Sequence, residues 1–225
     1  SVPAASAGYP VRVDNCGTAV TVTQPPRRIL TIKSSPLELL LALGLQDRIV
    51  GTAFSDGPVP AQWASVAGPL PVISAKVPGQ EAALTPRPDM IFAGWESNLT
   101  SQGAGDRATL AKLGVNTYVA PSACQEPAYE PKPMTFDRLW SQIEQAGQIF
   151  GVPRQAEVLV AQQKKTLASV MPSDKGFTAL WYSSGSKTPF VGAGIGAPEM
   201  IMEAAGLRNI ASDIPSTWTS LGWES

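Results

Sequence analysis

Histidine is absent from the 225-residue sequence. Its absence excludes the Ser-His-Asp triad, the Cys-His pair, the HExxH zinc site and haem ligation through histidine. The two cysteines are too few for a structural zinc site. Only 16% of the residues are charged, and the 17 basic and 18 acidic side chains nearly cancel. This balance argues against a nucleic-acid-binding protein, whose affinity depends on neutralising phosphates.

Long hydrophobic runs are absent as well. No stretch approaches the roughly 18 consecutive apolar residues of a transmembrane helix, so no transmembrane helix is predicted. The remaining composition, with 44% hydrophobic residues, is that of a globular protein. At about 150 residues per domain, the length corresponds to one or two domains.

Cys16 and Cys124 lie far apart in the sequence and form either one disulfide or two buried thiols. Asn15-Cys16-Gly17 is typical of a turn, and prolines surround Cys124, so both side chains are expected in exposed loops. A free thiol there would be a liability, which favours a disulfide and an oxidising compartment. Residues 1–10 are predicted to be a flexible tether, like the start of a mature secreted chain.

Short β-rich runs alternate with helical patterns, which predicts an α/β fold with mostly parallel sheets. The expected helices include Pro36–Leu43, opened by its proline, and Asp106–Leu113. The expected strands are Arg28–Ile32, Arg48–Phe54, Met90–Ala93, Thr117–Val119 and Ala179–Tyr182.

A proline-rich stretch at residues 121–133 is the best candidate for a boundary. After it, apolar residues follow the 3.6-residue period from Phe136 to Phe150. Gly151 then ends that helix, and Pro153 begins a second one that runs to about Val170. A long helix between two α/β units is typical of a rigid connection.

Residues 36–49 and 198–210 have a similar pattern. In each, a proline and a glutamate come near the start of a helix, and a Gly-Leu pair ends it. This similarity favours two lobes. Because any strand–helix unit with a glycine stop gives the same pattern, it does not establish them.

The loops after the strands are the candidate site, because ligands bind outside the carboxyl ends of the strands in open α/β sheets. Aromatic residues recur there beside small hydroxyl residues, which is typical of a binding site. No nucleophile–base pair occurs in these loops, so no catalytic residue is predicted. The candidate ligand-binding residues are Lys33, Ser34, Ser35, Phe54, Trp95, Tyr182, Lys187 and Trp218.

Ser34 or Ser35 is expected to cap the helix that begins at Pro36, so that free amides beside Lys33 would form an anion site. Together with Lys187 on another loop, this arrangement favours a ligand with phosphate or carboxylate groups. The alternatives are structural, namely a plain helix cap and tryptophans that only cover the edges of the core.

The segment Gly192-Ala-Gly-Ile-Gly-Ala197 matches the GxGxxG/A pattern of dinucleotide-binding folds, and Asp213 follows it. It is the basis of an alternative function, a nucleotide-dependent oxidoreductase. Few residues follow Ala197, whereas such a fold needs several further strand–helix units, so this function is disfavoured.

Four segments in order resemble the extracytoplasmic substrate-binding proteins of ABC importers, in the class that carries iron–siderophores, haem and cobalamin. The resemblance extends from about Val11 to Ser225. The segments are PPRRILTIKSSPLELLLALGLQDRIVG, QEAALTPRPDMIFAG, the helix after Pro153, and APEMIMEAAGLRNIA followed by TWTSLGWE.

The resemblance implies two α/β lobes joined by one long rigid helix, with the ligand between the lobes. The N-terminal lobe would be residues 1–150, the bridging helix 151–172 and the C-terminal lobe 173–225. Proteins of this class continue past the segment that matches Gly222-Trp223-Glu224, so the C-terminal lobe is expected to be incomplete.

The resemblance also implies roles for particular residues. Glu81 and Glu224 match glutamates that dock on arginines of the permease, where charge pairs set orientation and association rate. Phe54, Trp95 and Trp218 match aromatic ligand contacts.

The implied function is that of a non-catalytic, monomeric receptor outside the cytoplasm, either periplasmic or a cell-surface lipoprotein. It would pass a small-molecule ligand to an ABC permease with its cytoplasmic ATPase. No cofactor and no nucleic-acid partner are expected, and the sequence offers no group of residues that would hold a metal ion directly.

Within this class, segments such as GTAFSDGPVP, AGWESN, PSACQEP and LWYSSG resemble actinobacterial proteins proposed to take up a phosphorylated deazaflavin, a precursor of coenzyme F-420. That ligand is flat, aromatic and anionic, and many ferric siderophores are anionic too. The expected ligand is therefore a ferric siderophore-type chelate or a phosphorylated deazaflavin. A non-catalytic surface interaction domain is the remaining alternative.

Overall fold

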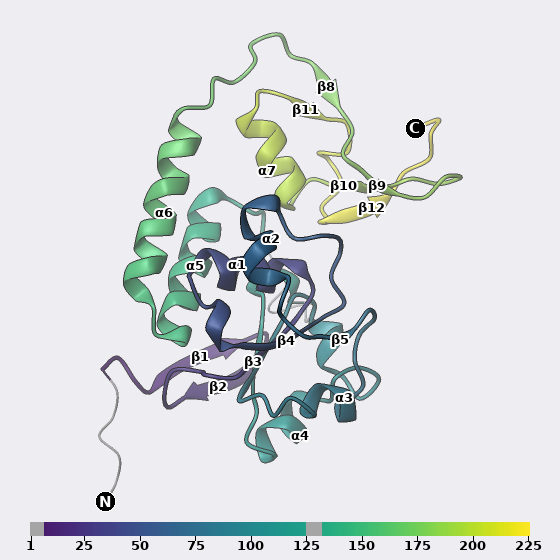
Figure 1. Ribbon diagram of the computed structural model, residues 1–225. Coiled ribbons are helices and arrows are strands. Elements are labelled where there is room, and N and C mark those ends of the chain that lie inside the picture. The colour runs from purple at the N-terminus through teal and green to yellow at the C-terminus, as the bar shows by residue number, and fades with distance from the viewer. Residues whose placement is uncertain (1–6, 125–131) are drawn as a thin grey trace, which may run out of the picture. The chain divides into compact units, whose positions relative to one another are not determined.

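The computed structural model describes residues 7–124 and 132–225 (Figure 1). Most of the expected tether and part of the expected boundary at 121–133 lie outside the described residues. The described chain forms two units. The first contains the residues up to 124 together with Ile143–Leu159, and the second contains residues 132–142 and Val160–Ser225.

A five-stranded parallel sheet forms the centre of the first unit, in the order β5-β4-β3-β6-β7. Four of its strands confirm the strands expected in this part of the sequence, and β5 was not predicted. It was missed because three residues are too few to show a pattern. The strands are β3 (Ile29–Ile32), β4 (Ile49–Ala53), β5 (Val72–Ser74), β6 (Met90–Ala93) and β7 (Asn116–Val119).

Both faces of this sheet are buried, as is typical of parallel sheets, and successive side chains alternate between them. On one face, Leu30 of β3 belongs to a hydrophobic cluster with Leu110 of a neighbouring helix. On the other, the Phe92 ring of β6 lies 5.2 Å from the Tyr118 ring and 5.5 Å from the Phe150 ring. The sheet therefore lies between two apolar layers, and its polar groups reach solvent only at its edges and ends.

Short helices connect the strands of the first unit. The expected helix at Asp106–Leu113 is confirmed as α4, and the Asp106 carboxylate accepts the Thr109 N–H at 2.9 Å as its N-cap. The helices are α1 (Ser34–Ala42), α2 (Ala64–Ala67), α3 (Gln80–Leu84) and α4 (Arg107–Lys112), with 3-10 turns η1 (Gln46–Arg48), η2 (Ala61–Trp63), η3 (Glu96–Leu99) and η4 (Pro121–Ala123).

Two longer helices, α5 (Phe136–Phe150) and α6 (Pro153–Ala168), follow as the sequence predicts. Gly151 lies between them with a φ of +73°, a conformation that favours glycine. Each of these helices contributes residues to both units. In the described part of the chain, none of the helices has the length and apolar character that crossing a bilayer requires.

A β-hairpin that the sequence did not predict, β1 (Val11–Asn15) and β2 (Thr18–Val22), precedes β3. Tyr9, which lies in the stretch expected as a tether, donates its hydroxyl hydrogen to the carbonyl of Ile149 at 2.9 Å. Asn15 at the hairpin turn accepts two hydrogen bonds from the Arg107 guanidinium, on its backbone and side-chain oxygens. Burial lowers the pKa of Arg107 to about 10.

The disulfide between Cys16 and Cys124 is present, as expected. Both cysteines are 7% exposed and belong to the same hydrophobic cluster as Leu30. The expectation that they lie in exposed loops is therefore wrong. Cys16, Cys124 and the neighbouring Ala123 pack against the residues of the sheet, which a local sequence pattern does not reveal.

The second unit contains two small sheets. In one, β9 (Tyr182–Ser184), β10 (Phe190–Gly192) and β12 (Trp218–Ser220) pair antiparallel in the order β12-β10-β9. In the other, β8 (Thr178–Ala179) and β11 (Arg208–Asn209) pair in parallel.

The second unit thus differs from the expectation in two ways. Its larger sheet is antiparallel, whereas mostly parallel sheets were expected. The single strand expected at Ala179–Tyr182 is divided between β8 and β9, because its two ends pair with different partners, β11 and β10.

The helices α1 and α7 (Ala197–Ala204) end in the same way. Gly44 and Gly206 follow them with φ of +75° and +76°. The next residue, Leu45 or Leu207, donates its N–H to a carbonyl five residues earlier at 2.9 Å. This is the Schellman ending, for which glycine is favoured because it adopts a left-handed conformation without strain. The similarity between residues 36–49 and 198–210 therefore reflects a shared helix ending.

Replacing both cysteines by alanine is expected to lower the free energy of unfolding of the first unit by about 2–4 kcal/mol, because the 108-residue separation makes a long constrained loop. Urea denaturation would measure the difference. Reduced wild-type protein is the control and should unfold at nearly the same urea concentration as the double variant. A double variant as stable as the oxidised wild type would contradict the prediction.

Candidate functional site

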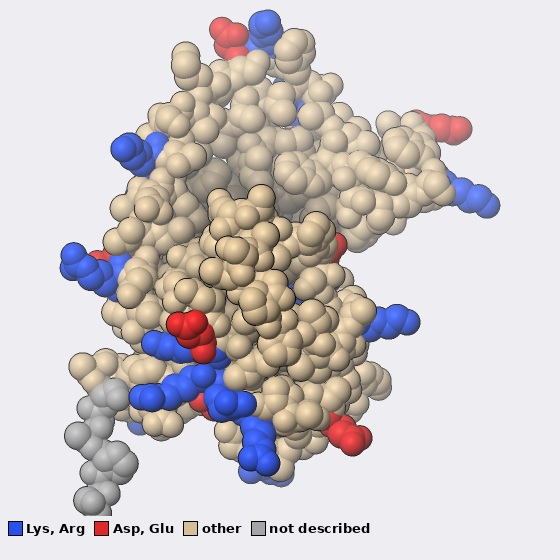
Figure 2. All heavy atoms as spheres, in the orientation of Figure 1, with Lys and Arg blue, Asp and Glu red and all other residues tan. Residues whose placement is uncertain are grey.

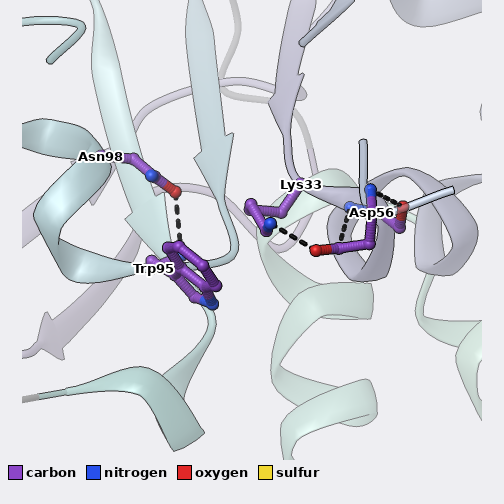
Figure 3. Close-up of polar contacts among 5 residues, drawn as sticks. Lys33, Asp56, Trp95 and Asn98 are labelled. Carbon is purple, nitrogen blue, oxygen red and sulfur yellow. Dashed lines mark hydrogen bonds and ion pairs between the residues drawn. The ribbon is translucent and has the colours of Figure 1, made fainter. Parts of the chain in front are cut away.

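Three loops at one edge of the first unit's sheet bring together Lys33, Phe54 and Trp95. Figure 3 shows Lys33 and Trp95 of this group. Lys33 directly follows β3, Phe54 directly follows β4, and Trp95 comes two residues after β6. Since β3 lies between β4 and β6 and all three are parallel, their carboxyl ends meet at this edge. This is the part of an open α/β sheet where ligands bind.

The Lys33 ammonium group lies close to two aromatic rings. Its Nζ atom is 4.1 Å from the centre of the Phe54 ring and 4.0 Å from the centre of the Trp95 ring. The two rings meet edge to face, with their centres 5.7 Å apart. The lysine side chain is 6% exposed, whereas Trp95 is 48% exposed. The cation is therefore enclosed, and the tryptophan presents free aromatic surface to a ligand.

Asp56, on the same loop as Phe54, neutralises this lysine through an ion pair with its ammonium group. Its carboxylate also accepts the Ser34 N–H at 3.3 Å, and its own N–H donates to the Ser34 hydroxyl oxygen at 2.8 Å. Asp56 is not among the residues predicted from the sequence. Its position could have suggested this role, because Asp56 is an acidic residue in a loop at the same edge of the sheet as Lys33.

The expected helix cap is wrong. The helix α1 begins at Ser34, its N-cap is Lys33, and no side chain of that segment caps it. Asp56 takes this place from the loop after another strand, an interaction that spans 22 residues. Ser35 is exposed on the first turn of α1.

Two residues of the site have unusual backbone conformations. Lys33 has φ +81° and ψ 164°, a region that glycine almost alone occupies, and Phe54 has φ +52°. Each such residue costs about 1–3 kcal/mol and persists only when its surroundings fix it. Strain of this kind is concentrated at ligand sites, which supports a binding role for this sheet edge.

Gly94 and Asn98 hold Trp95 in place. A Cβ atom on Gly94 would lie 2.7 Å from the Lys33 Cβ, so only glycine allows this close approach. The Asn98 side chain, which is 2% exposed, accepts the Trp95 N–H at 3.0 Å. Neither residue was predicted from the sequence, although Gly94 directly precedes Trp95 and Asn98 follows it by three residues.

The three predicted ligand-binding residues of the second unit, Tyr182, Lys187 and Trp218, lie on or beside its antiparallel sheet. Trp218 stacks on Phe190 with ring centres 6.0 Å apart, and Tyr182 stacks on Trp223 at 6.3 Å. Trp223 also donates its indole N–H to the Ser186 carbonyl at 3.0 Å. Lys187 is exposed in the connection between β9 and β10. Phe190 and Trp223 were missed, because their stacking partners lie on strands that are distant in sequence.

The glycine-rich segment before α7 does not have the geometry of a dinucleotide site. The N–H groups of Gly192, Ala193, Gly194 and Ile195 all donate to carbonyls of the chain itself. A Cβ atom on Gly194 would lie 2.0 Å from the Ser212 carbonyl oxygen. These glycines permit close packing of two backbone segments, and the amides that would bind a pyrophosphate are occupied. The oxidoreductase alternative is therefore not supported.

The residues expected to dock on a permease are both at the surface. Glu81 lies exposed on the first turn of α3, and Glu224 lies exposed near the end of the chain. Figure 2 shows that most of the visible face is uncharged and that its largest basic group adjoins an acidic one. Within the described residues, no three Cys, Asp or Glu side chains gather into a group that could hold a metal ion.

Comparison with known proteins identifies the family. The chain matches the family described as Periplasmic binding protein over residues 29–225. It belongs to this family. Periplasmic binding proteins bind solutes without transforming them, and membership places this chain outside the cytoplasm. The buried disulfide is in keeping with that location.

Two curated relatives are similar to this periplasmic binding protein. The uncharacterized ABC transporter substrate-binding lipoprotein YvrC of Bacillus subtilis is 25% identical over 74% of this chain and 48% of its own length. A cobalamin-binding protein of Halobacterium salinarum is 26% identical over 91% of this chain and 51% of its own length. The chain thus spans about half the length of the curated relatives it matches.

A solved structure supports the fold. The crystal structure of a periplasmic binding protein from Veillonella parvula matches with a TM-score of 0.80 and 25% identity. The match covers 95% of this chain and 72% of that protein. The α/β fold class predicted from the sequence is confirmed.

Replacing Gly94 by alanine is expected to lower the free energy of unfolding of the first unit by about 1–3 kcal/mol, because the new Cβ would displace Lys33. Urea denaturation would measure the loss. Gly57→Ala is the matched control, since a Cβ there has no atom within 4 Å and the residue lies beside Asp56. Equal stabilities of the two variants would contradict the prediction.

Proposed function

We propose that this chain is the ligand-binding part of a receptor for an ABC importer. Membership of the periplasmic binding protein family and the similarity to a substrate-binding lipoprotein support the proposal. The observation that carries it is the strained, enclosed cluster of Lys33, Phe54 and Trp95 at the carboxyl edge of the parallel sheet. The partners would be a membrane permease and its ATPase, and the receptor would act as a monomer.

The proposed ligand is a large chelate or macrocycle of the siderophore, haem or cobalamin type. The similarity to a cobalamin-binding protein supports this class. So does the half-exposed Trp95 ring, because a flat face of this size suits a broad, partly apolar ligand. A phosphorylated deazaflavin is the second ligand candidate, favoured by the exposed Lys187, which could pair with a phosphate.

The second unit would contribute ligand contacts of its own. Trp218 is 37% exposed and Tyr182 is 53% exposed, so both keep aromatic surface available although each stacks on another ring. We also retain as a proposal that residues 151–172, which contain α6, form the connection between two lobes, 1–150 and 173–225. Anchoring by a lipid is proposed on the similarity to a lipoprotein.

Titration of tryptophan fluorescence tests this function directly. The panel contains a cationic ferric hydroxamate, an anionic ferric catecholate, haem, cobalamin and a deazaflavin phosphate. Saturable quenching by one class is expected. Saturation by none of the five, with folded protein, would contradict the proposed ligand class.

Trp95→Ala is expected to weaken the binding of the ligand identified in this way by about 10- to 100-fold, because an exposed aromatic anchor is removed. Trp140→Ala is the matched control. Trp140 also lies beside a lysine, 5.2 Å from Lys164 Nζ, but it lies on α5 and belongs to no candidate site. Isothermal titration calorimetry would measure both affinities, and equal losses in the two variants would argue against a ligand contact at Trp95.

Glu81→Ala is expected to leave ligand affinity unchanged and to reduce cellular uptake by about tenfold or more, because an exposed carboxylate that orients the receptor on the permease is lost. Uptake of labelled ligand by cells that carry the full-length receptor would measure this. Glu157→Ala, an exposed glutamate of α6, is the control and should transport normally. Normal uptake by the Glu81→Ala variant would show that Glu81 does not take part in docking on the permease.

A further inference from the structure

The accessible charge immediately beside Lys33, at the carboxyl ends of β3 and β4, is negative. The Lys33 side chain is 6% exposed and lies against two rings, whereas the Asp56 side chain that pairs with it is 55% exposed. A ligand that approaches this edge therefore meets the carboxylate more readily than the ammonium group. Figure 3 shows Asp56 directly beside Lys33.

The same carboxylate also occupies the start of α1. The Ser34 N–H, which would be available to an anion at a free helix start, donates to Asp56. The anionic ligand predicted from the sequence depended on Lys33, the free amides at the start of the helix and Lys187. The Lys33 ammonium and the Ser34 amide are engaged by the protein itself, whereas Lys187 belongs to the second unit. A phosphate or carboxylate of a ligand would have to replace the Asp56 carboxylate in these contacts. The two negative charges would then remain close together and repel each other.

A second acidic residue strengthens this effect. Glu38 on α1 is half-buried, and its pKa is raised first by burial and then by the nearby charge of Asp56. The two carboxylates therefore repel each other at this edge. The basic residue nearest to Asp56 in sequence, Arg48, precedes β4 and so lies at the opposite edge of the sheet. Lys76 is exposed in the loop after β5, which ends at the same edge as β4.

We propose that Asp56 sets the charge selectivity of this site, so that the first unit accepts a neutral or cationic part of a ligand in preference to an anionic one. Amide and ammonium groups fit, because they can donate hydrogen bonds to the exposed carboxylate. Ferric hydroxamates and corrinoids with amide side chains carry such groups. This inference rests on the proposed function and narrows its ligand class.

The test compares wild type, Asp56→Asn and Asp47→Asn with two probes, a cationic ferric trihydroxamate and an anionic ferric tricatecholate. Wild type is expected to bind the cationic probe more tightly. Asp56→Asn is expected to weaken binding of the cationic probe and strengthen that of the anionic probe, each by about tenfold, because one nearby charge is removed. Asp47, exposed before β4 and hence at the opposite edge of the same sheet, is the control and should have no effect.

Inorganic phosphate provides a further readout that needs no variant. It is expected not to quench the tryptophan fluorescence of wild type, since Asp56 occupies the anion position. Tighter binding of the anionic probe by wild type, quenching by phosphate, or an unchanged affinity ratio in folded Asp56→Asn would each overturn the inference. Binding of the probes with the opposite charge preference would overturn this inference and leave the proposed function intact. No saturable binding of any chelate, corrinoid or deazaflavin would instead contradict the ligand class of the proposed function.

Discussion

The parallel pairing of β3 with β4 and β6 is the constraint on which the candidate site depends. Parallel strands end at the same edge, so the residues that follow them are brought together although they are far apart in the sequence. Lys33, Phe54 and Trp95 meet for this reason alone. Both faces of the sheet are buried, which fixes the strand register and leaves the loops as the accessible part of the sheet.

The enclosure of a lysine by two rings has a cost that the rest of the site must offset. Lys33 adopts a backbone conformation typical of glycine, and its ammonium group has little contact with water. Contacts with the rings, the ion pair with Asp56 and the close approach of Gly94 provide the compensation. A site of this kind is preorganised, since its charged group is already held when a ligand arrives.

The glycine-rich segment before α7 illustrates how a motif can mislead. Its spacing fits a dinucleotide site, but its amides are bonded within the chain and its glycines permit packing against residues 212–217. Such a motif is recognised by its structural context and not by its spacing. By contrast, the family resemblance depended on several segments in order, and the match over residues 29–225 agrees with it.

The sequence by itself determined the alternation of strands and helices, the two long helices, the disulfide partners and the family, because these follow from local periodicity, composition and the order of segments. The sequence also placed Lys33, Phe54 and Trp95 in loops that follow strands. Only the tertiary structure decided that Asp56, 22 residues after Ser34, caps α1 and neutralises Lys33. Likewise, only the fold placed the cysteines in the core and divided the strand expected at Ala179–Tyr182 between two sheets. The physical reason is that these features are contacts between distant segments, whose energy does not depend on the residues next to them in the chain.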